Sequence, residues 1–146
     1  MTEVLIKRLS KNIELPKYET NGSSGMDLLA NIEKQIEIEP GKTSIIPTGI
    51  SVAIPKNFEI QIRSRSGLAA KSQVSVLNSP GTIDADYRGE LKVILINLSN
   101  KTFVVERGAR IAQMVLCPIV KAKFKEVDSL DDTNRGVGGF GSTGLK

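Results

Sequence analysis

The sequence predicts an all-β domain, a sandwich or barrel built from many short strands. Apolar and polar residues alternate in stretches such as 36–39 and 58–63, and this period of two is typical of half-buried strands. Turn-forming pairs such as Pro40-Gly41 recur at short spacing between these stretches. Strands do not alternate with long helices, and 146 residues suit a single domain.

Strands are expected along most of the chain, because β-branched residues dominate many of its stretches. The expected strands cover residues 4–6, 24–30, 36–39, 44–54, 58–63, 91–98, 102–105 and 111–123. Pro47-Thr48-Gly49 interrupts the fourth of these and predicts a bend or bulge. Only residues 67–71 are expected to be helical, for one or two turns.

The C-terminal part differs in composition from the rest of the chain. Residues 128–134 are polar, and residues 136–144 are mostly glycine and small residues. Such a segment cannot bury enough apolar surface to order itself. We therefore expect a β domain over residues 1–127 and a mobile arm over residues 128–146.

Histidine is absent, which excludes Ser-His-Asp and Cys-His catalytic groups and His-based zinc sites. Acid–base chemistry must use Asp, Glu, Lys, Tyr or water, and a catalytic metal would be a hard cation such as Mg²⁺. The single cysteine, Cys117, cannot form an intramolecular disulfide, which suits a reducing cytoplasm, and its apolar neighbours favour a core position. No membrane span or signal peptide is visible.

The net charge of +4 is compatible with a negatively charged ligand. The basic residues are scattered singly with few aromatics beside them, so a solvated basic surface is a simpler explanation than a polynucleotide site. We expect no nucleic-acid partner and no membrane partner, whereas small polyanions fit the charge.

Reactive side chains are most concentrated in residues 81–90, which follow Pro80 and contain two glycines. Proline and glycine at this density are typical of a tight β-hairpin, not of a strand interior. The hairpin tip would bring together two carboxylates, a ring and a guanidinium, on Asp84, Asp86, Tyr87 and Arg88. This hairpin is the candidate reaction centre.

Residues 63–71 leave a strand and enter the short helix, with Ser66 as the expected N-cap. Backbone N–H groups at a helix start attract phosphate, and two arginines precede this point. A capped helix with surface arginines is an equally good explanation.

Two further polar positions lie in otherwise apolar strands. Asp27 is either the partner of an arginine or a group that supports metal-bound water, because a buried carboxylate requires a partner. Arg110 and Gln113 begin another strand, either as a hydrogen-bonded interface pair or as substrate contacts.

The arm contains a GxGxxG pattern at residues 136–141. A dinucleotide fingerprint requires a helix after this pattern, and only five residues follow; no lysine follows either, which excludes a P-loop. Bare N–H groups with Arg135, Ser142 and Thr143 would form a flexible anion cradle, and Phe140 can stack on a base. A lid that closes on a ligand explains these residues better than a disordered tail.

Five stretches, taken in order, resemble the motifs of the homotrimeric dUTP pyrophosphatases (dUTPases). They are SGMDLLA, RSRSGLAAK, NSPGTIDADYRGE, GARIAQ and RGVGGFGSTG, and they span about residues 24–144. The resemblance implies a distorted β jelly-roll and a homotrimer with active sites at subunit boundaries. It also implies Mg²⁺-dependent cleavage of dUTP into dUMP and pyrophosphate, which limits uracil in DNA and supplies dUMP for dTTP synthesis.

The resemblance also implies roles for individual residues of the hairpin. Asp84 matches the general base that activates the attacking water. Tyr87 matches the ring that packs under the deoxyribose and leaves no room for a 2′-hydroxyl. Asn78 and the hairpin backbone at Thr82 and Ile83 match the edge that reads uracil.

Other residues match contacts to the phosphates and the metal. Arg65, Ser66, Gly67 and Gln113 match phosphate contacts, with Ser66 near the α–β bridge, and Asp27 resembles a residue that supports the waters of the metal. Uracil stacking and binding of the terminal phosphates are implied for the arm, at Arg135, Phe140, Gly141, Ser142 and Thr143.

Two other functions stay open from the sequence. A dCTP deaminase of the same superfamily requires a carboxylate that shuttles protons at the cytosine ring, and residues 63–71 contain no glutamate. A non-catalytic protein that senses dUTP would be indicated by loss of Asp84 or of the arm, and both are present.

Overall fold

The computed structural model describes residues 1–144, and within them strands dominate. The elements in order are β1 (Leu5–Arg8), β2 (Met26–Leu29), β3 (Ile36–Ile38), β4 (Thr43–Ala53), β5 (Phe58–Arg63), α1 (Ser66–Ser72), β6 (Val74–Val76), β7 (Gly81–Ile83), β8 (Glu90–Asn97), β9 (Phe103–Val105) and β10 (Arg110–Pro118). The prediction of an all-β fold with one short helix is confirmed.

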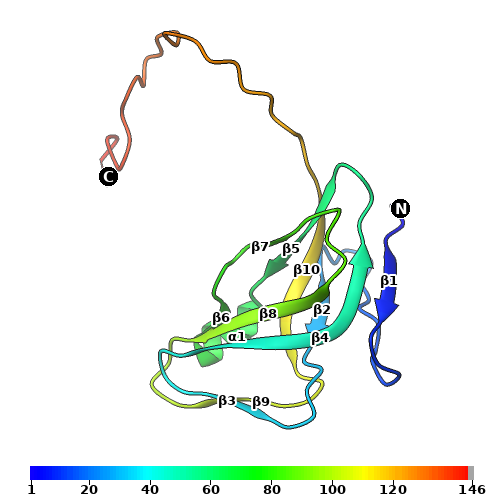
Figure 1. The fold of residues 1–146 in the computed structure, drawn as a ribbon. Helices are drawn as coiled ribbons and strands as arrows, with labels where there is room; N and C mark the ends of the chain where they lie inside the picture. Colours follow the sequence, from blue (N-terminus) through cyan, green and yellow to red (C-terminus); the bar gives the residue numbers. More distant parts are fainter. Residues whose placement is uncertain (145–146) are drawn as a thin grey trace.

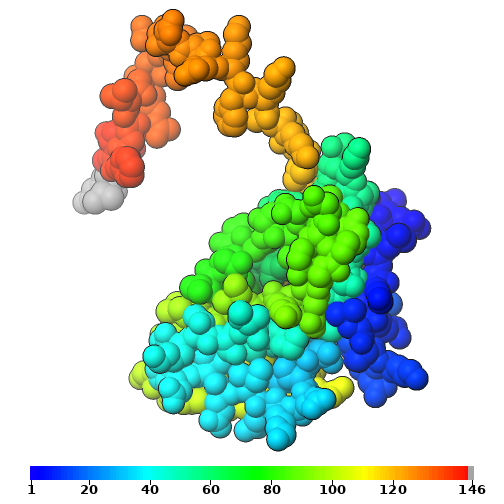
Figure 2. Space-filling model, viewed as in Figure 1, coloured from blue at the N-terminus to red at the C-terminus, as the bar shows by residue number. Residues whose placement is uncertain are grey.

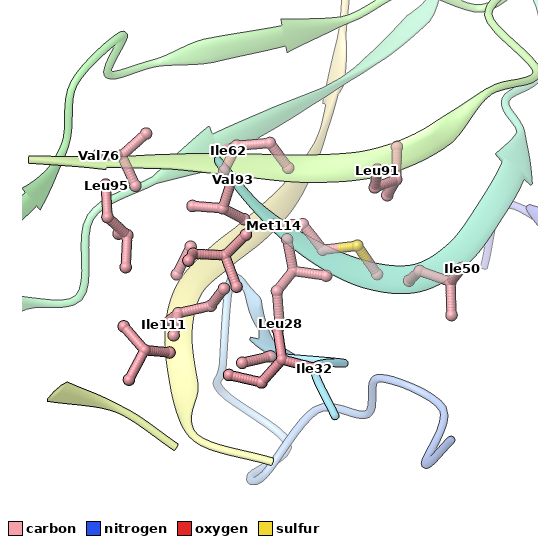
Figure 3. Close-up of a cluster of buried hydrophobic side chains, with 14 of the residues drawn as sticks. Leu28, Ile32, Ile50, Ile62, Val76, Leu91, Val93, Leu95, Ile111 and Met114 are labelled. Carbon is pink, nitrogen blue, oxygen red and sulfur yellow. The ribbon is translucent and has the colours of Figure 1, made fainter. Parts of the chain in front are cut away.

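The strands form two four-stranded antiparallel sheets that enclose one core (Figure 1). The first sheet has the order β1-β4-β8-β6 and the second β2-β10-β5-β7, while β3 and β9 form a separate pair. Apolar side chains from both sheets meet between them, as Figure 3 shows for Leu28 of β2, Leu91 of β8 and Ile111 of β10. The core is therefore that of a β-sandwich.

The inward positions of β8 show how the sequence pattern builds this core. Leu91 is fully buried while its neighbour Lys92 is exposed, as the period of two requires. Asn97 continues the inward series, and its amide donates to the carbonyls of Ile38 and Lys101 at 2.8 and 2.7 Å. A buried polar side chain is tolerated here because it is fully hydrogen-bonded.

The predicted interruption of β4 is a β-bulge at Gly49. The pairing of β4 with β8 shifts register between Pro47 and Ser51, and Gly49 has a φ of 72°, which glycine adopts at least cost. The N–H of Gly49 donates to the side chain of Glu90 at 2.9 Å instead of to a strand carbonyl. The bulge of β4 is thus connected to the start of β8 by the Glu90 side chain.

The prediction of a tight hairpin over residues 81–90 is wrong. β7 pairs with β5 in the second sheet, whereas β8 pairs with β4 and β6 in the first. The segment between them, residues 84–89, therefore crosses from one sheet to the other. Glycine and proline mark where a chain turns, but they do not specify which strands pair on either side.

The core position expected for Cys117 is also wrong. Cys117 is half-buried, and its sulfur lies 3.7 Å from the guanidinium of Arg63 on the outer face of the second sheet. Met114, at the opposite parity of β10, is buried. The apolar run of the sequence hides this alternation, so composition alone does not distinguish the two faces.

The C-terminal segment leaves the sandwich at the end of β10. This strand ends at Pro118 and not at residue 123, and the N–H of Ile119 donates to the carbonyl of Asn57 at 2.8 Å. Beyond this point Val120 and Phe124 are 98% and 94% exposed, and the chain extends away from the body (Figures 1 and 2). Within residues 1–144 no helix is long and apolar enough to cross a membrane.

Candidate active site

The crossing between the sheets, residues 84–89, forms a compact loop that we call the Asp84 loop. The N–H of Tyr87 donates to the carbonyl of Asp84 at 3.2 Å, and the Tyr87 hydroxyl donates to the carbonyl of Glu90 at 3.0 Å. The Arg88 guanidinium donates to the carbonyls of Ala85 and Tyr87 at 2.7 and 3.0 Å. Arg88 therefore stabilises the loop and is not a free anion clamp.

A pocket of about 290 Å³ opens beside the Asp84 loop. It is lined by Thr82, Ile83, Asp84, Tyr87, Glu90 and Lys92. The Asp84 side chain is exposed, and it forms no hydrogen bond or ion pair with any residue of the described chain, 1–144. The pocket thus combines an unengaged carboxylate with an aromatic ring that is 44% exposed.

Asn78 lies at the entrance to β7, close to this loop. A Cβ added at Gly81 would lie 3.3 Å from the Asn78 side-chain nitrogen, so the amide packs directly on the glycine. Thr82 follows on the outer face of the strand and is exposed. The polar edge expected from Asn78 and the β7 backbone is therefore accessible.

A second polar group, the arginine cluster, consists of Asp27, Arg65 and Arg110. Asp27 accepts from Arg65 Nε at 3.0 Å through one oxygen, and its other oxygen lies 3.4 Å from Arg110 Nη1. The Asp27 side chain is only 12% exposed, and a carboxylate at this depth requires such charged partners. Of the two interpretations of Asp27, the structure shows the arginine partners, and it does not test the support of metal-bound water.

Strand register brings Gln113 to the same cluster. Gln113 of β10 faces Asp27 of β2 on one side and Arg63 of β5 on the other. Its side chain is exposed, as is that of Arg110, which also pairs with Glu19 at 3.5 Å. The cluster is therefore an open, polar end of the second sheet.

The start of α1 adjoins the arginine cluster, but Ser66 does not cap it. The helix begins at Ser66, and Arg65 occupies the N-cap position with an extended backbone and no side-chain cap. The prediction of Ser66 as N-cap is wrong by one residue. Ser66 and Gly67 are both exposed, and no atom lies within 4 Å of a Cβ added at Gly67.

The Asp84 loop and the arginine cluster lie at opposite ends of β5 within one chain. Ile60 of β5 pairs with Ile83, next to Asp84, whereas Arg65 follows the other end of β5. Arg65 is five positions after Ile60, and at about 3.3 Å per residue this corresponds to roughly 16 Å along the chain. A single chain therefore does not bring Asp84 and Arg65 to the same phosphate group.

The arm residues form local turns away from both groups (Figure 1). Arg135 Nε donates to the carbonyl of Gly138 at 2.9 Å, and the N–H of Ser142 donates to the carbonyl of Gly139 at 3.1 Å. Phe140 is fully exposed. Within one chain the structure does not place the arm residues beside the pocket.

Comparison with known proteins assigns the chain to a family. A family model described as dUTPase matches residues 11–144. The chain is 56% identical over 146 residues to the deoxyuridine 5'-triphosphate nucleotidohydrolase of Rickettsia bellii (strain OSU 85-389), covering 99% of this chain and 97% of the relative. The enzyme of the same name from Fusobacterium nucleatum is 52% identical over 145 residues, with 99% of each chain covered. The chain belongs to the dUTPase family.

A dUTPase of Staphylococcus bacteriophage 80alpha, a mutant with dUpNHpp, has the same fold. It superposes with a TM-score of 0.88 at 26% sequence identity, covering 99% of this chain and 100% of that chain. The predicted family, fold class and enzyme class, a dUTP diphosphatase, are thereby confirmed.

Two residues around the dUTPase site were not singled out from the sequence. Glu90 and Lys92 line the pocket. Their signal is their position on a strand, since both lie at the start of β8. That signal becomes readable only when the strand pairing is known.

Proposed function

We propose that this dUTPase-family chain hydrolyses dUTP to dUMP and pyrophosphate with Asp84 as the general base. The family supports the reaction, and the unengaged Asp84 carboxylate beside Tyr87 supports the role of Asp84. The carboxylate takes a proton from water as the water oxygen bonds to the α-phosphorus. The bond from that phosphorus to the α–β bridging oxygen breaks, and pyrophosphate leaves.

The nucleoside would bind at the Asp84 loop. The exposed Tyr87 ring offers an apolar face for the deoxyribose, and its distance from the sugar decides whether a 2′-hydroxyl fits. Asn78 with the backbone at Thr82 and Ile83 offers donors and acceptors for uracil. The pocket brings the Tyr87 ring together with Thr82 and Ile83 at the end of β7.

The phosphates would bind at the arginine cluster and the start of α1. Arg65 is held by Asp27, so its guanidinium is already oriented before substrate arrives. The open backbone at Ser66 and Gly67 allows a phosphate to approach closely. Gln113 adds an exposed amide on the neighbouring strand.

We propose Mg²⁺ as the cofactor. Residues 1–144 contain no group of three His, Cys, Asp or Glu side chains that could hold a metal, so the ion would be carried mainly by the substrate phosphates. Asp27 fits a contact through water, because each of its oxygens interacts with one arginine and keeps a further lone pair. When bound, the ion would neutralise charge on the phosphates.

Three copies of the chain would complete each site. The outer face of the first sheet carries exposed apolar side chains. Ile45 is 60% and Leu77 is 52% exposed, and both neighbour Ile94 of β8. Ile45 is the strand partner of Ile94, and the Leu77 N–H donates to the Ile94 carbonyl. An exposed apolar patch of this kind is typical of an interaction surface. A second copy on this face would bring its own arginine cluster near the Asp84 loop, which one chain alone does not do.

The arm would close the assembled site. Phe140 would stack on uracil, and the Gly141 backbone with Arg135, Ser142 and Thr143 would hold the terminal phosphates. Support comes from the full exposure of Phe140, and within residues 1–144 no hydrogen bond between the arm and the sandwich would have to break. The single cysteine favours the cytoplasm as the location.

The experiment that tests the assignment compares Asp84→Asn with Asp86→Asn, an exposed aspartate on the same loop. We expect pyrophosphate release from dUTP to fall by about 100-fold or more in Asp84→Asn, the scale of a lost general base. Asp86→Asn should keep nearly full activity. Normal turnover in Asp84→Asn, or an equal loss in both variants, would overturn the assignment of Asp84. Assays with dCTP and UTP beside dUTP test the substrate.

A further inference from the structure

Glu90 connects the Asp84 loop to the body of the protein through both its side chain and its backbone. Its half-buried carboxylate accepts a hydrogen bond from the N–H of Gly49 at 2.9 Å, across 41 residues of sequence. Its backbone carbonyl accepts the Tyr87 hydroxyl at 3.0 Å. One residue therefore joins the β4 bulge to the ring that faces the sugar.

The bulge is a firm anchor for this connection. A Cβ at Gly49 would collide with Ile13 and would lie 2.6 Å from the Asn31 amide nitrogen, so the segment is closely packed. The buried Thr48 hydroxyl donates to the carbonyl of Leu91 at 2.6 Å, directly beside the Glu90 contact. The position of Glu90 is thus fixed from two neighbouring points of β4.

The Tyr87 ring is held at two points. The ring is 44% exposed and packs on Gly89, and within residues 1–144 its hydroxyl donates to the Glu90 carbonyl. Without that hydrogen bond, only the packing on Gly89 would hold the ring in its position in the pocket. The anchor of Glu90 therefore limits where the ring can lie.

We infer that Glu90 is a positioning residue for substrate selection, which holds Tyr87 at the distance that accepts deoxyribose and rejects ribose. The inference rests on the proposed function, in which Tyr87 contacts the sugar. Glu90 is assigned this role through its hydrogen bonds to Gly49 and Tyr87, and not through contact with the reacting atoms. The hydrogen bond between the Glu90 side chain and Gly49 sets the position of the Glu90 backbone carbonyl. This carbonyl accepts the hydrogen bond from the Tyr87 hydroxyl.

The test measures kcat/KM for dUTP and for UTP in the wild type, Glu90→Ala, Glu90→Gln and Glu37→Ala. We expect the dUTP-to-UTP ratio to fall about tenfold in Glu90→Ala, the scale of a lost hydrogen bond to a charged group. Glu90→Gln keeps an acceptor oxygen and should restore the ratio to within about twofold. Glu37→Ala, at an exposed position of β3, should change nothing.

A double-mutant cycle with Tyr87→Phe separates this role from general stability. If Glu90 acts through the tyrosine hydroxyl, the effects of Glu90→Ala and Tyr87→Phe on the ratio will not add. If Glu90→Ala does not fold, Glu90→Asp, whose carboxylate is one carbon shorter, replaces it and should show the same loss. An unchanged ratio, or additive effects, would overturn the inference, whereas a wild type inactive on dUTP would overturn the proposed function itself.

Discussion

The Tyr87 ring packs directly on Gly89 in the Asp84 loop. A Cβ added at Gly89 would collide with the Tyr87 hydroxyl and would lie 2.5 Å from the ring carbon that carries it. Gly89 has no positive φ that would require glycine. The glycine is therefore needed for the space it leaves to the ring.

The variant Gly89→Ala should displace the ring and break its hydrogen bond to Glu90. We expect kcat/KM for dUTP to fall by about tenfold, while the midpoint of thermal unfolding changes little because the loop is exposed. Gly22→Ala is the matched control, since no atom lies within 4 Å of its added Cβ. Full activity in Gly89→Ala would contradict a fixed ring.

Single residues differ in how far the sequence predicts their surroundings. For Asp27 the sequence predicted a partner, because a carboxylate in an apolar strand requires one, but it left an arginine and metal-bound water as alternatives. The identity of these partners, Arg65 and Arg110, becomes clear only from the strand register. Cys117 could not be placed, because an apolar run does not show which parity of the strand faces inward.

Among the elements, most strands could be predicted, although β6 was not, and their partners could not. The alternation in residues 58–63 and the interruption at Gly49 correspond to β5 and to the bulge of β4. The segment 81–90 was expected to pair with itself, yet β7 and β8 belong to different sheets. Pairing depends on contacts between residues distant in sequence, which local pattern does not contain.

The arm is the element whose removal separates assembly from closure. We expect deletion of the residues after Asn134 to leave the oligomer intact and to lower dUTP hydrolysis strongly, because the arm makes no hydrogen bond to the sandwich within residues 1–144. Size-exclusion chromatography and pyrophosphate release measure the two properties. Val137→Ala, at an exposed arm position without an assigned contact, is the control. Hydrolysis at the full rate after deletion would show that the arm is no lid.

At the scale of the whole molecule, one chain carries both halves of a site but holds them apart. Asp84 follows the end of β7 that pairs with Ile60, while Arg65 lies beyond the other end of β5, roughly 16 Å along the chain from Ile60. A general base that acts at the α-phosphorus and an arginine that holds the phosphates beside it are brought together more readily when they come from two copies. The account therefore requires that Asp84 and Arg65 of one site come from different copies.

Mixed oligomers of two inactive variants test this requirement most directly. Asp84→Asn and Arg65→Ala chains are co-expressed with different tags, and oligomers that carry both tags are isolated and assayed for pyrophosphate release from dUTP. If the two residues of a site belong to different chains, each trimer that carries both tags has one intact site in three, and hence about a third of wild-type activity. Activity no higher than that of the separate variants would contradict a site shared between subunits.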